Sequence, residues 1–190
     1  MSTGRTSDTA DTIFFPDAAA FESWLAENVD HQPGVWLKIA KKSSGIPSLT
    51  DDEAVDVGLC FGWISGQRRS LDDVYYLQKY VPRRPRSRWS QVNVRKVHEL
   101  TAAGRMRPAG LAEVEAAQAD GRWDAAYESQ KDATVPPDLA AALAASPRAT
   151  AAFEALGKTD QYAVILDVVT ARLPETRATH VRKAIAALEA

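Results

Sequence analysis

The sequence predicts an α+β protein in which a small, mainly antiparallel sheet with packed helices is followed by a C-terminal helical domain. Three observations carry this prediction. Short apolar runs of strand type, two of them bounded by proline or glycine, occur in the first 82 residues. Helix start signals and apolar residues at helical spacing accompany them. From residue 137 onward the chain is rich in alanine, and its apolar residues recur only at helical spacing.

These patterns divide the chain into four parts. Residues 1–12 are polar, small and aperiodic, so we expect a disordered leader. Residues 13–124 form the predicted α+β domain, and residues 137–190 form the predicted helical domain. Residues 125–136 have little periodicity and run into consecutive prolines, which makes them the expected linker.

The first expected strand and the first expected helix are separated by a proline. Ile13–Phe15 is a short apolar run that Pro16 stops. Asp17 then has the place of an N-cap, because its carboxylate can accept hydrogen bonds from the amides of a first helical turn. Phe21 and Leu25, with Trp24 between them, lie at the spacing of one helical face.

A second strand and a second helix are expected next. Val35–Ile39 alternates in the manner of a strand that buries one face, with Val35, Leu37 and Ile39 on that face. Thr50 and Glu53 have the spacing of a capping box, in which the hydroxyl and the carboxylate each satisfy a free amide at a helix start. We expect that helix to continue through Leu59.

The following segment is expected to form an antiparallel pair of strands. Phe61–Ile64 is apolar, and its glycine indicates a bulge or a close approach of two backbones. Ser65–Asp73 is polar and is expected to be a turn. Val74–Val81 is rich in tyrosine and valine, as a partner strand should be. The prolines at positions 82 and 85 end this strand and keep the next segment extended.

Helices are expected over most of the remaining chain. One begins at Ser87 or Ser90, either of which can cap it, and stops at Gly104. Another runs from about Pro108 to Asp120. The C-terminal part is predicted to hold further helices, whose signals are a serine followed by proline at 146–147, an apolar stripe from 162 to 169, and a final apolar stripe within 176–188.

The chain carries no motif of a common enzyme or metal site. Its single cysteine, Cys60, lies among apolar residues that keep a thiol inert. The three histidines, His31, His98 and His180, are far apart and form no metal-binding pair. No phosphate-binding glycine loop or nucleophile elbow occurs. We therefore expect no catalytic residue, no metal and no cofactor, which favours a protein that is not an enzyme.

The cellular location is expected to be cytoplasmic. The first residues lack the apolar run of a signal peptide, and no later run approaches the length that spans a membrane, so we expect no membrane insertion. A single cysteine cannot form an internal disulfide, which agrees with a reducing compartment.

Positive charge is concentrated in one part of the sequence. The chain has 23 basic and 25 acidic residues, but the segment from Gly66 to Arg107 holds eleven Lys or Arg and only three acids. Within it, four arginines alternate with prolines and precede Trp89 and a helix start. Guanidinium groups beside helix amides suit phosphate or carboxylate ligands. The alternative is a solvated basic surface whose arginine stems pack over the tryptophan. The predicted ligand-binding residues are Trp63, Tyr76, Arg83, Arg84, Arg86, Arg88, Trp89 and Asn93.

Several short motifs of this chain resemble a known bacterial family. They are Gly62-Trp63-Ile64, then Pro82-Arg83-Arg84 with Ser87, Trp89, Ser90 and Asn93, and Glu175-Thr176-Arg177 before the last helix. In this order, from about Phe15 to the end, the chain is similar to the YdeI/OmpD-associated proteins, also called bacteriocin-protection proteins. The resemblance implies a C-terminal helical domain and a role in resistance to cationic antimicrobial peptides. Members often have an acid after the first motif, where this chain has Ser65.

One functional prediction and two alternatives follow. We expect a non-enzymatic, cytoplasmic stress or antimicrobial-resistance protein that binds an anionic ligand, a phosphate-bearing partner or another protein. The first alternative is a nucleic-acid-binding module, which would present a flat basic face. The second is a small-molecule enzyme with a cleft near Trp63 and Arg83, which Tyr76 and Trp89 would also line.

Overall fold

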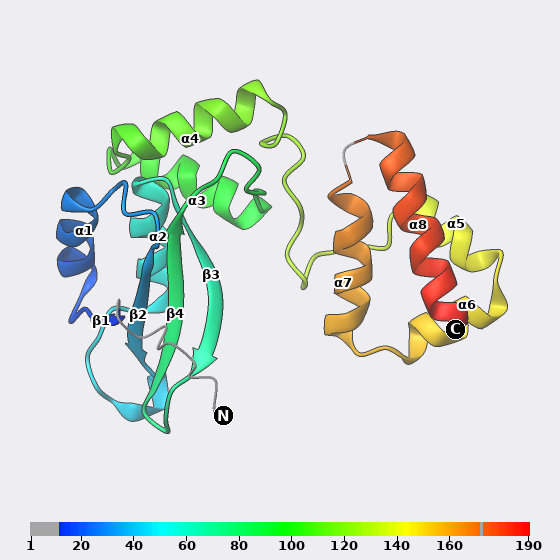
Figure 1. The fold of residues 1–190 in the computed structure, drawn as a ribbon, viewed down its shortest axis with the longest axis horizontal. Coiled ribbons are helices and arrows are strands. Elements are labelled where there is room, and N and C mark those ends of the chain that lie inside the picture. The colour runs from blue at the N-terminus through cyan, green and yellow to red at the C-terminus, as the bar shows by residue number, and fades with distance from the viewer. Residues whose placement is uncertain (1–11, 172) are drawn as a thin grey trace, which may run out of the picture. The chain divides into compact units, whose positions relative to one another are not determined.

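The computed structural model describes residues 12–171 and 173–190, so nearly all of the predicted leader lies outside the described residues. The chain divides into two compact units. The first unit comprises Met1–Ser87 and Arg95–Asp120, and the second comprises Arg88–Val94 and Gly121–Ala190. Each unit has its own core and is described separately below (Figure 1).

The first unit contains a four-stranded sheet (Figure 1). The strand order is β1-β2-β4-β3, and the bounds in that order are Thr12–Phe14, Val35–Ala40, Tyr75–Pro82 and Trp63–Ser70. β1 pairs in parallel with β2, whereas the other two pairings are antiparallel. The predicted α+β class with a small, mainly antiparallel sheet is therefore confirmed.

The strand β3 is longer than the sequence predicts. The polar residues from Ser65 onward were expected to form a turn, but β3 continues through Ser70, with an irregular register between Ser65 and Arg68. The buried side chain of Gln78 on β4 stabilises this polar part of β3 by hydrogen bonds. Its amide donates to the carbonyl of Gly66 at 2.9 Å, and its oxygen accepts from Arg68 Nε at 2.8 Å. Side-chain hydrogen bonds thus stabilise the part of β3 from Ser65 onward, which lacks apolar residues.

Two helices pack on one face of this sheet. α1 (Ala18–Glu27) begins at Asp17, whose Oδ1 accepts from the amide of Ala20 at 2.8 Å. α2 (Asp51–Cys60) begins with the predicted capping box of Thr50 and Glu53, in which both reciprocal bonds are present. Rings from the sheet meet these helices: Tyr80 of β4 contacts Phe21 of α1 edge-on. A short 3₁₀ helix over Lys42–Ser44 lies between β2 and α2 in the chain.

The helix α4 (Pro108–Ala119) lies unusually close to α2 because two glycines allow it. A Cβ at Gly110 would lie 2.3 Å from the carbonyl oxygen of Cys60. Gly62, at φ +75°, would place a Cβ 3.0 Å from the carbonyl oxygen of Ala109, which is the close backbone approach expected there. The backbone amide of Arg107 also donates to Cys60 O at 3.0 Å, so the start of α4 is fixed on the end of α2.

The boundary between the two units falls within the helix α3 (Gln91–Ala102): its residues up to Val94 belong to the second unit, and those from Arg95 onward belong to the first. Ser90 caps it, since its Oγ accepts from the amide of Asn93 at 3.2 Å. Ser87 instead closes the preceding turn, where its Oγ accepts from the amide of Arg84 at 2.9 Å. Of the two predicted caps, Ser90 is the one that the structure uses.

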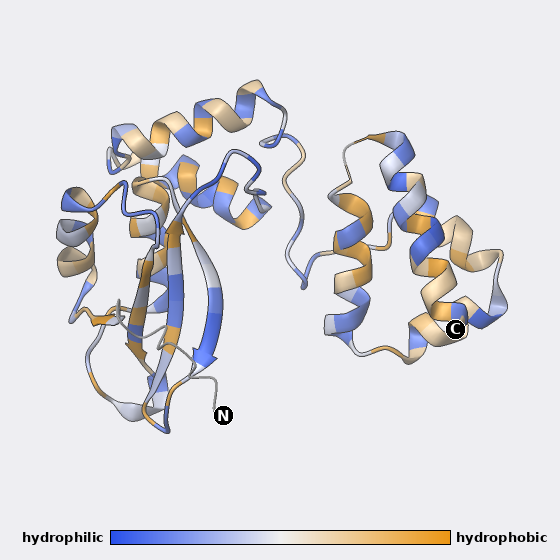
Figure 2. Ribbon diagram, in the orientation of Figure 1, coloured by the Kyte–Doolittle hydropathy of each residue, from blue (hydrophilic) through white to orange (hydrophobic). Residues whose placement is uncertain are grey.

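Four helices and a core of their own make up most of the second unit. They are α5 (Pro137–Ala144), α6 (Pro147–Ala155), α7 (Lys158–Val169) and α8 (Pro174–Glu189). Figure 2 shows apolar residues recurring along each of these helices. The core residues are Leu139, Leu143, Ala149, Phe153, Ile165, Val168 and Val181. Among the described residues, no helix has the length and apolar character needed to cross a membrane.

Candidate functional site

The two tryptophans of the predicted ligand-binding set are core residues. Trp63 is 1% exposed, its ring meets Trp24 edge-on, and its indole N–H donates to Val29 O at 2.9 Å. Trp89 is 2% exposed and contacts the ring of Trp123, with 4.9 Å between the centroids. Both rings are therefore buried, and buried side chains of this kind stabilise the fold.

The predicted arginines have different surroundings. Arg83 is only 6% exposed, and its backbone amide donates to Gly62 O at 2.9 Å. Arg84 and Arg86 are exposed in the first unit, whereas Arg88 is exposed in the second. Arg83 thus presents little of its side chain to a partner. The anion-binding role of the exposed arginines stays a prediction.

The remaining two members of the set also have structural contacts. Asn93 lies in the first turn of α3, where its amide meets the cap Ser90. Tyr76 lies under the guanidinium of Arg68, at 4.7 Å from the ring centroid, and Arg68 forms an ion pair with Asp51 at 2.6 Å. Burial raises the pKa of the Tyr76 hydroxyl. Tyr76 lines a cavity beside the start of α2, whereas Trp63 and Arg83 are buried, so the cleft expected near these two residues stays a prediction.

A different group of basic residues lies on the sheet face that points away from α1 and α2. Residues paired across neighbouring strands share a face, which places Trp36 with Lys79, and Lys38 with Phe14 and Leu77. We call this surface the basic sheet face. Its residues are Phe14, Trp36, Lys38, Arg69, Tyr75, Leu77 and Lys79.

Each basic side chain of the basic sheet face lies over an aromatic ring. Lys38 Nζ is 4.0 Å from the ring centroid of Tyr75. The guanidinium carbon of Arg69 is 4.4 Å, and Lys79 Nζ is 5.5 Å, from the ring of Trp36. This arrangement is favourable because the negative ring face attracts a cation while the aliphatic stem covers apolar surface. It also explains why Trp36 is only 3% exposed on a face that neither helix covers.

The electrostatic balance of the basic sheet face is one-sided. The four strands contain four basic residues and no Asp or Glu. Within the described part of the chain, neither Lys38 nor Lys79 lies at ion-pair distance from a carboxylate. Arg68, the fourth base, is turned to the other face and pairs with Asp51. The strands of this face therefore contribute basic side chains and no acidic one.

Aromatic rings are accessible beside these charges. Phe14 is 42% exposed and meets Tyr75 edge-on, with 6.2 Å between the centroids. Both rings come from strands, so their positions are set by the sheet. The same face thus combines basic side chains with partly open rings.

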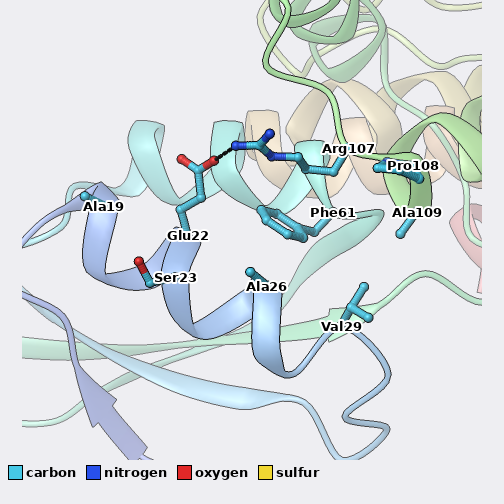
Figure 3. A pocket seen from close by; sticks show the side chains of 9 residues that line it. All are labelled: Ala19, Glu22, Ser23, Ala26, Val29, Phe61, Arg107, Pro108 and Ala109. Carbon is cyan, nitrogen blue, oxygen red and sulfur yellow. Dashed lines mark hydrogen bonds and ion pairs between the residues drawn. The ribbon is translucent and has the colours of Figure 1, made fainter.

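A second candidate site is a pocket that α1 lines together with Phe61 and the start of α4 (Figure 3). Its volume is about 670 Å³, and its walls are α1, the end of α2 and the start of α4. Figure 3 shows Glu22 and Arg107 reaching toward each other across the pocket above Phe61, and their ion pair measures 2.7 Å. We call this the α1–α4 pocket. It is lined by Ala19, Glu22, Ser23, Ala26, Val29, Phe61, Arg107, Pro108 and Ala109.

Cys60 is buried, and burial raises the pKa of its thiol, so a reactive thiolate is disfavoured. Among the described residues, no three His, Cys, Asp or Glu side chains are grouped in a way that could hold a metal ion.

Sequence reasoning overlooked the basic sheet face, although a signal for it was present. The alternation of Val35–Ile39 assigns Val35, Leu37 and Ile39 to the buried face. The same alternation puts Trp36 and Lys38 on the opposite face, and Lys79 follows by the same rule on β4. The pairing of β2 with β4, which brings them together, is not visible in the sequence.

Comparison with known families divides the chain in two. Residues 13–113 match the family model described as "Domain of unknown function (DUF8412)". Residues 132–190 match the model described as "Bacteriocin-protection, YdeI or OmpD-Associated", which confirms the predicted resemblance for this part. The first motifs that suggested the resemblance, including Gly62-Trp63-Ile64, lie in the other match. Neither a curated protein nor a solved structure matches the chain.

Proposed function

We propose that this chain, which belongs to the family described as "Domain of unknown function (DUF8412)", is a non-enzymatic protein that binds single-stranded nucleic acid on its basic sheet face. One observation carries the proposal: Lys38, Arg69 and Lys79 lie over aromatic rings on one face of strands that contain no acid. Phosphates are attracted to such a face because their binding releases condensed counterions.

The arrangement of the charges favours a polymer over a small anion. The three basic side chains come from three strands, β2, β3 and β4. Opposite partners Trp36–Lys79 and Lys38–Leu77 are two residues apart along the strands, which corresponds to a spacing of about 7 Å. Arg69 and Lys79 lie over Trp36 and Lys38 lies over Tyr75, so the charges are divided between two positions on the face. A chain of phosphates can meet them one after another.

The aromatic rings favour a single strand over a duplex. Unpaired bases can turn outward and stack on aromatic side chains, and every base has a flat face for this. Phe14 and Tyr75 are the rings of the basic sheet face that are most open. In a duplex the base faces are stacked on one another, so only its phosphates would contribute to binding.

Salt dependence of binding tests this proposal. Wild-type protein and a Lys38→Gln/Lys79→Gln variant are titrated against fluorescently labelled oligothymidylate over a range of salt concentrations. Each phosphate contact on a single strand contributes about 0.7 to the log–log slope, so the variant should lose about 1.4 from it. Wild-type binding that does not depend on salt, or a variant with an unchanged slope, contradicts the proposal.

Two control variants separate this face from other basic residues. Lys158→Gln/Lys183→Gln removes the same charge from exposed positions in the second unit and should leave the slope unchanged. Arg84→Gln/Arg86→Gln tests the segment that the sequence singled out. A slope that is flattened by this variant and not by the lysine variant would place the anion contacts on the arginine segment instead.

The biological setting is part of the same proposal. We propose that the chain acts in the cytoplasm in stress or antimicrobial resistance; the resistance part is motivated by the printed description of the model that residues 132–190 match, "Bacteriocin-protection, YdeI or OmpD-Associated". Bacterial cells that express the wild-type chain should survive a cationic bacteriocin better than cells that express the Lys38→Gln/Lys79→Gln variant at the same level. Equal survival of the two strains would show that nucleic-acid binding through Lys38 and Lys79 does not contribute to resistance.

A further inference from the structure

The α1–α4 pocket has the size and the fixed walls of a small-molecule site. A volume of about 670 Å³ lies within the usual range for such sites, about 300–1,000 Å³. The bond from Arg107 N to Cys60 O and the contact at Gly110 hold the start of α4 against the end of α2. The pocket is thus formed before any ligand enters, which lowers the cost of binding.

The floor and one wall of the pocket are apolar and uncrowded. Phe61 is buried at the floor, and Val29 is a further apolar residue of the lining. The wall formed by α1 carries the small side chains Ala19 and Ala26 on its exposed surface. An apolar group of several carbon atoms therefore has room next to the ring of Phe61.

The polar part of the pocket consists of two opposite charges side by side. Arg107 and Glu22 form one hydrogen bond, between an Arg107 terminal nitrogen and Glu22 Oε1 at 2.7 Å. Arg107 has further N–H donors, and Glu22 has a second carboxylate oxygen. In the described part of the chain, neither residue makes another ion pair. Both residues can therefore bind a ligand without giving up their own contact.

We propose that the α1–α4 pocket binds a zwitterionic ligand, an α-amino acid with an apolar side chain. Its carboxylate accepts hydrogen bonds from Arg107, its ammonium group donates to Glu22, and its side chain lies over Phe61. A ligand with only one of these charges makes only one of the two contacts and brings its charge close to the pocket residue of like sign. The pocket therefore discriminates against simple carboxylic acids and simple amines. This proposal is independent of nucleic-acid binding by the basic sheet face.

Titration with L-phenylalanine and its truncated analogues tests the proposal. Binding is followed in ¹H–¹⁵N correlation spectra of the full chain. L-Phenylalanine should saturate shifts of residues around Phe61, whereas 3-phenylpropionate, which lacks the ammonium group, and phenethylamine, which lacks the carboxylate, should each bind at least about tenfold more weakly. A tenfold loss corresponds to about 1.4 kcal/mol, the size of one charge-assisted hydrogen bond. Equal binding of the three compounds, or no saturable binding of L-phenylalanine or L-leucine, overturns the proposal.

Variants locate the binding in the pocket. Ala26→Leu fills the pocket from an exposed helix position and should abolish binding without lowering the melting temperature. Ala116→Leu makes the same change on an exposed position of α4 outside the pocket and should leave binding unchanged. Arg107→Gln should weaken the binding of L-phenylalanine far more than the binding of phenethylamine, because only L-phenylalanine has a carboxylate. Undiminished binding in Ala26→Leu would show that the ligand binds elsewhere and would overturn the assignment.

Discussion

At the scale of single residues, the two central tryptophans illustrate how burial decides a role. Trp63 and Trp89 both come from the basic, aromatic segment that suggested a ligand site, yet each ring is enclosed by another tryptophan and by neighbouring backbone. Lys38 and Lys79 lie on strands outside the arginine segment and are partly exposed. The two tryptophans therefore have a structural role, whereas the lysines remain accessible at the surface of the sheet.

Truncation of these tryptophans should reduce stability strongly. Trp63→Ala removes a fully buried ring and leaves a cavity, so the free energy of unfolding should fall by about 3–5 kcal/mol. Trp89→Ala should cost a similar amount. Urea denaturation measures both effects. Near-native stability of either variant would contradict a core role for that ring.

The pair Asp138–Arg177 gives a prediction about pH. Arg177 binds Asp138 through two nitrogens at 2.6 and 2.9 Å, and these hydrogen bonds lower the pKa of the carboxyl group. A lowered pKa in the folded state means that this stabilisation is present above the unfolded pKa of about 3.9 and is lost as the pH falls through the folded pKa. Because the pair is largely exposed, its contribution is small, about 0.5 kcal/mol.

Comparison of variants across pH reveals this contribution. Arg177→Gln should be less stable than wild type at pH 6, and the difference should fade as the pH falls below about 4. Arg182→Gln, on the same helix, removes an arginine whose described partner is the hydroxyl of Thr179, so its effect should change little over this range. A difference between wild type and Arg177→Gln that grows toward acid pH would reverse the assigned sign.

At the scale of helices and strands, the contact between α2 and α4 depends on the absence of one side chain. Gly110→Ala would place a Cβ 2.3 Å from the carbonyl oxygen of Cys60, so the two helices must move apart. Overpacking of this kind costs about 1–3 kcal/mol. Gly66→Ala is a suitable control, because its Cβ would meet nothing closer than 3.7 Å. Thermal melting that is equal for the two variants would argue against a tight α2–α4 contact.

Local signals in the sequence predicted these elements where the chemistry is local. Asp17, the Thr50–Glu53 capping box and the serine before Pro147 each cap the helix that was expected after them, because a cap needs only neighbouring residues. The polar half of β3 could not be predicted, since Arg68 and Gly66 are held by Gln78 of another strand. The burial of Arg83 likewise depends on tertiary packing and not on its neighbours in sequence.

The two candidate surfaces likewise could not be predicted from local sequence patterns alone. Alternation within β2 indicates that Lys38 and Trp36 share a face, but the sequence does not show that β4 brings Tyr75 and Lys79 to that face. The α1–α4 pocket combines Glu22 with Arg107, which are 85 positions apart in the chain. Both surfaces arise from strand order and helix contacts, which local patterns do not specify.

At the scale of the whole molecule, the two units match different families and offer different chemistry. The first unit carries the basic sheet face and the α1–α4 pocket, within or next to the match at residues 13–113. The second unit carries an apolar helical core and most of the match at residues 132–190. The near-neutral net charge of −2 therefore conceals a local excess of positive charge on the sheet.

The indole signals of the protein provide the most direct test of nucleic-acid binding by the basic sheet face. The chain has five tryptophans, and Trp36 and Trp63 lie on opposite faces of the sheet. In ¹H–¹⁵N spectra, addition of oligothymidylate should shift the indole signal of Trp36, because phosphates draw Arg69 and Lys79 away from its ring. The signal of Trp63, which is bonded to Val29 O under α1, should stay in place. A shift of Trp63 with no change at Trp36 would contradict binding on this face.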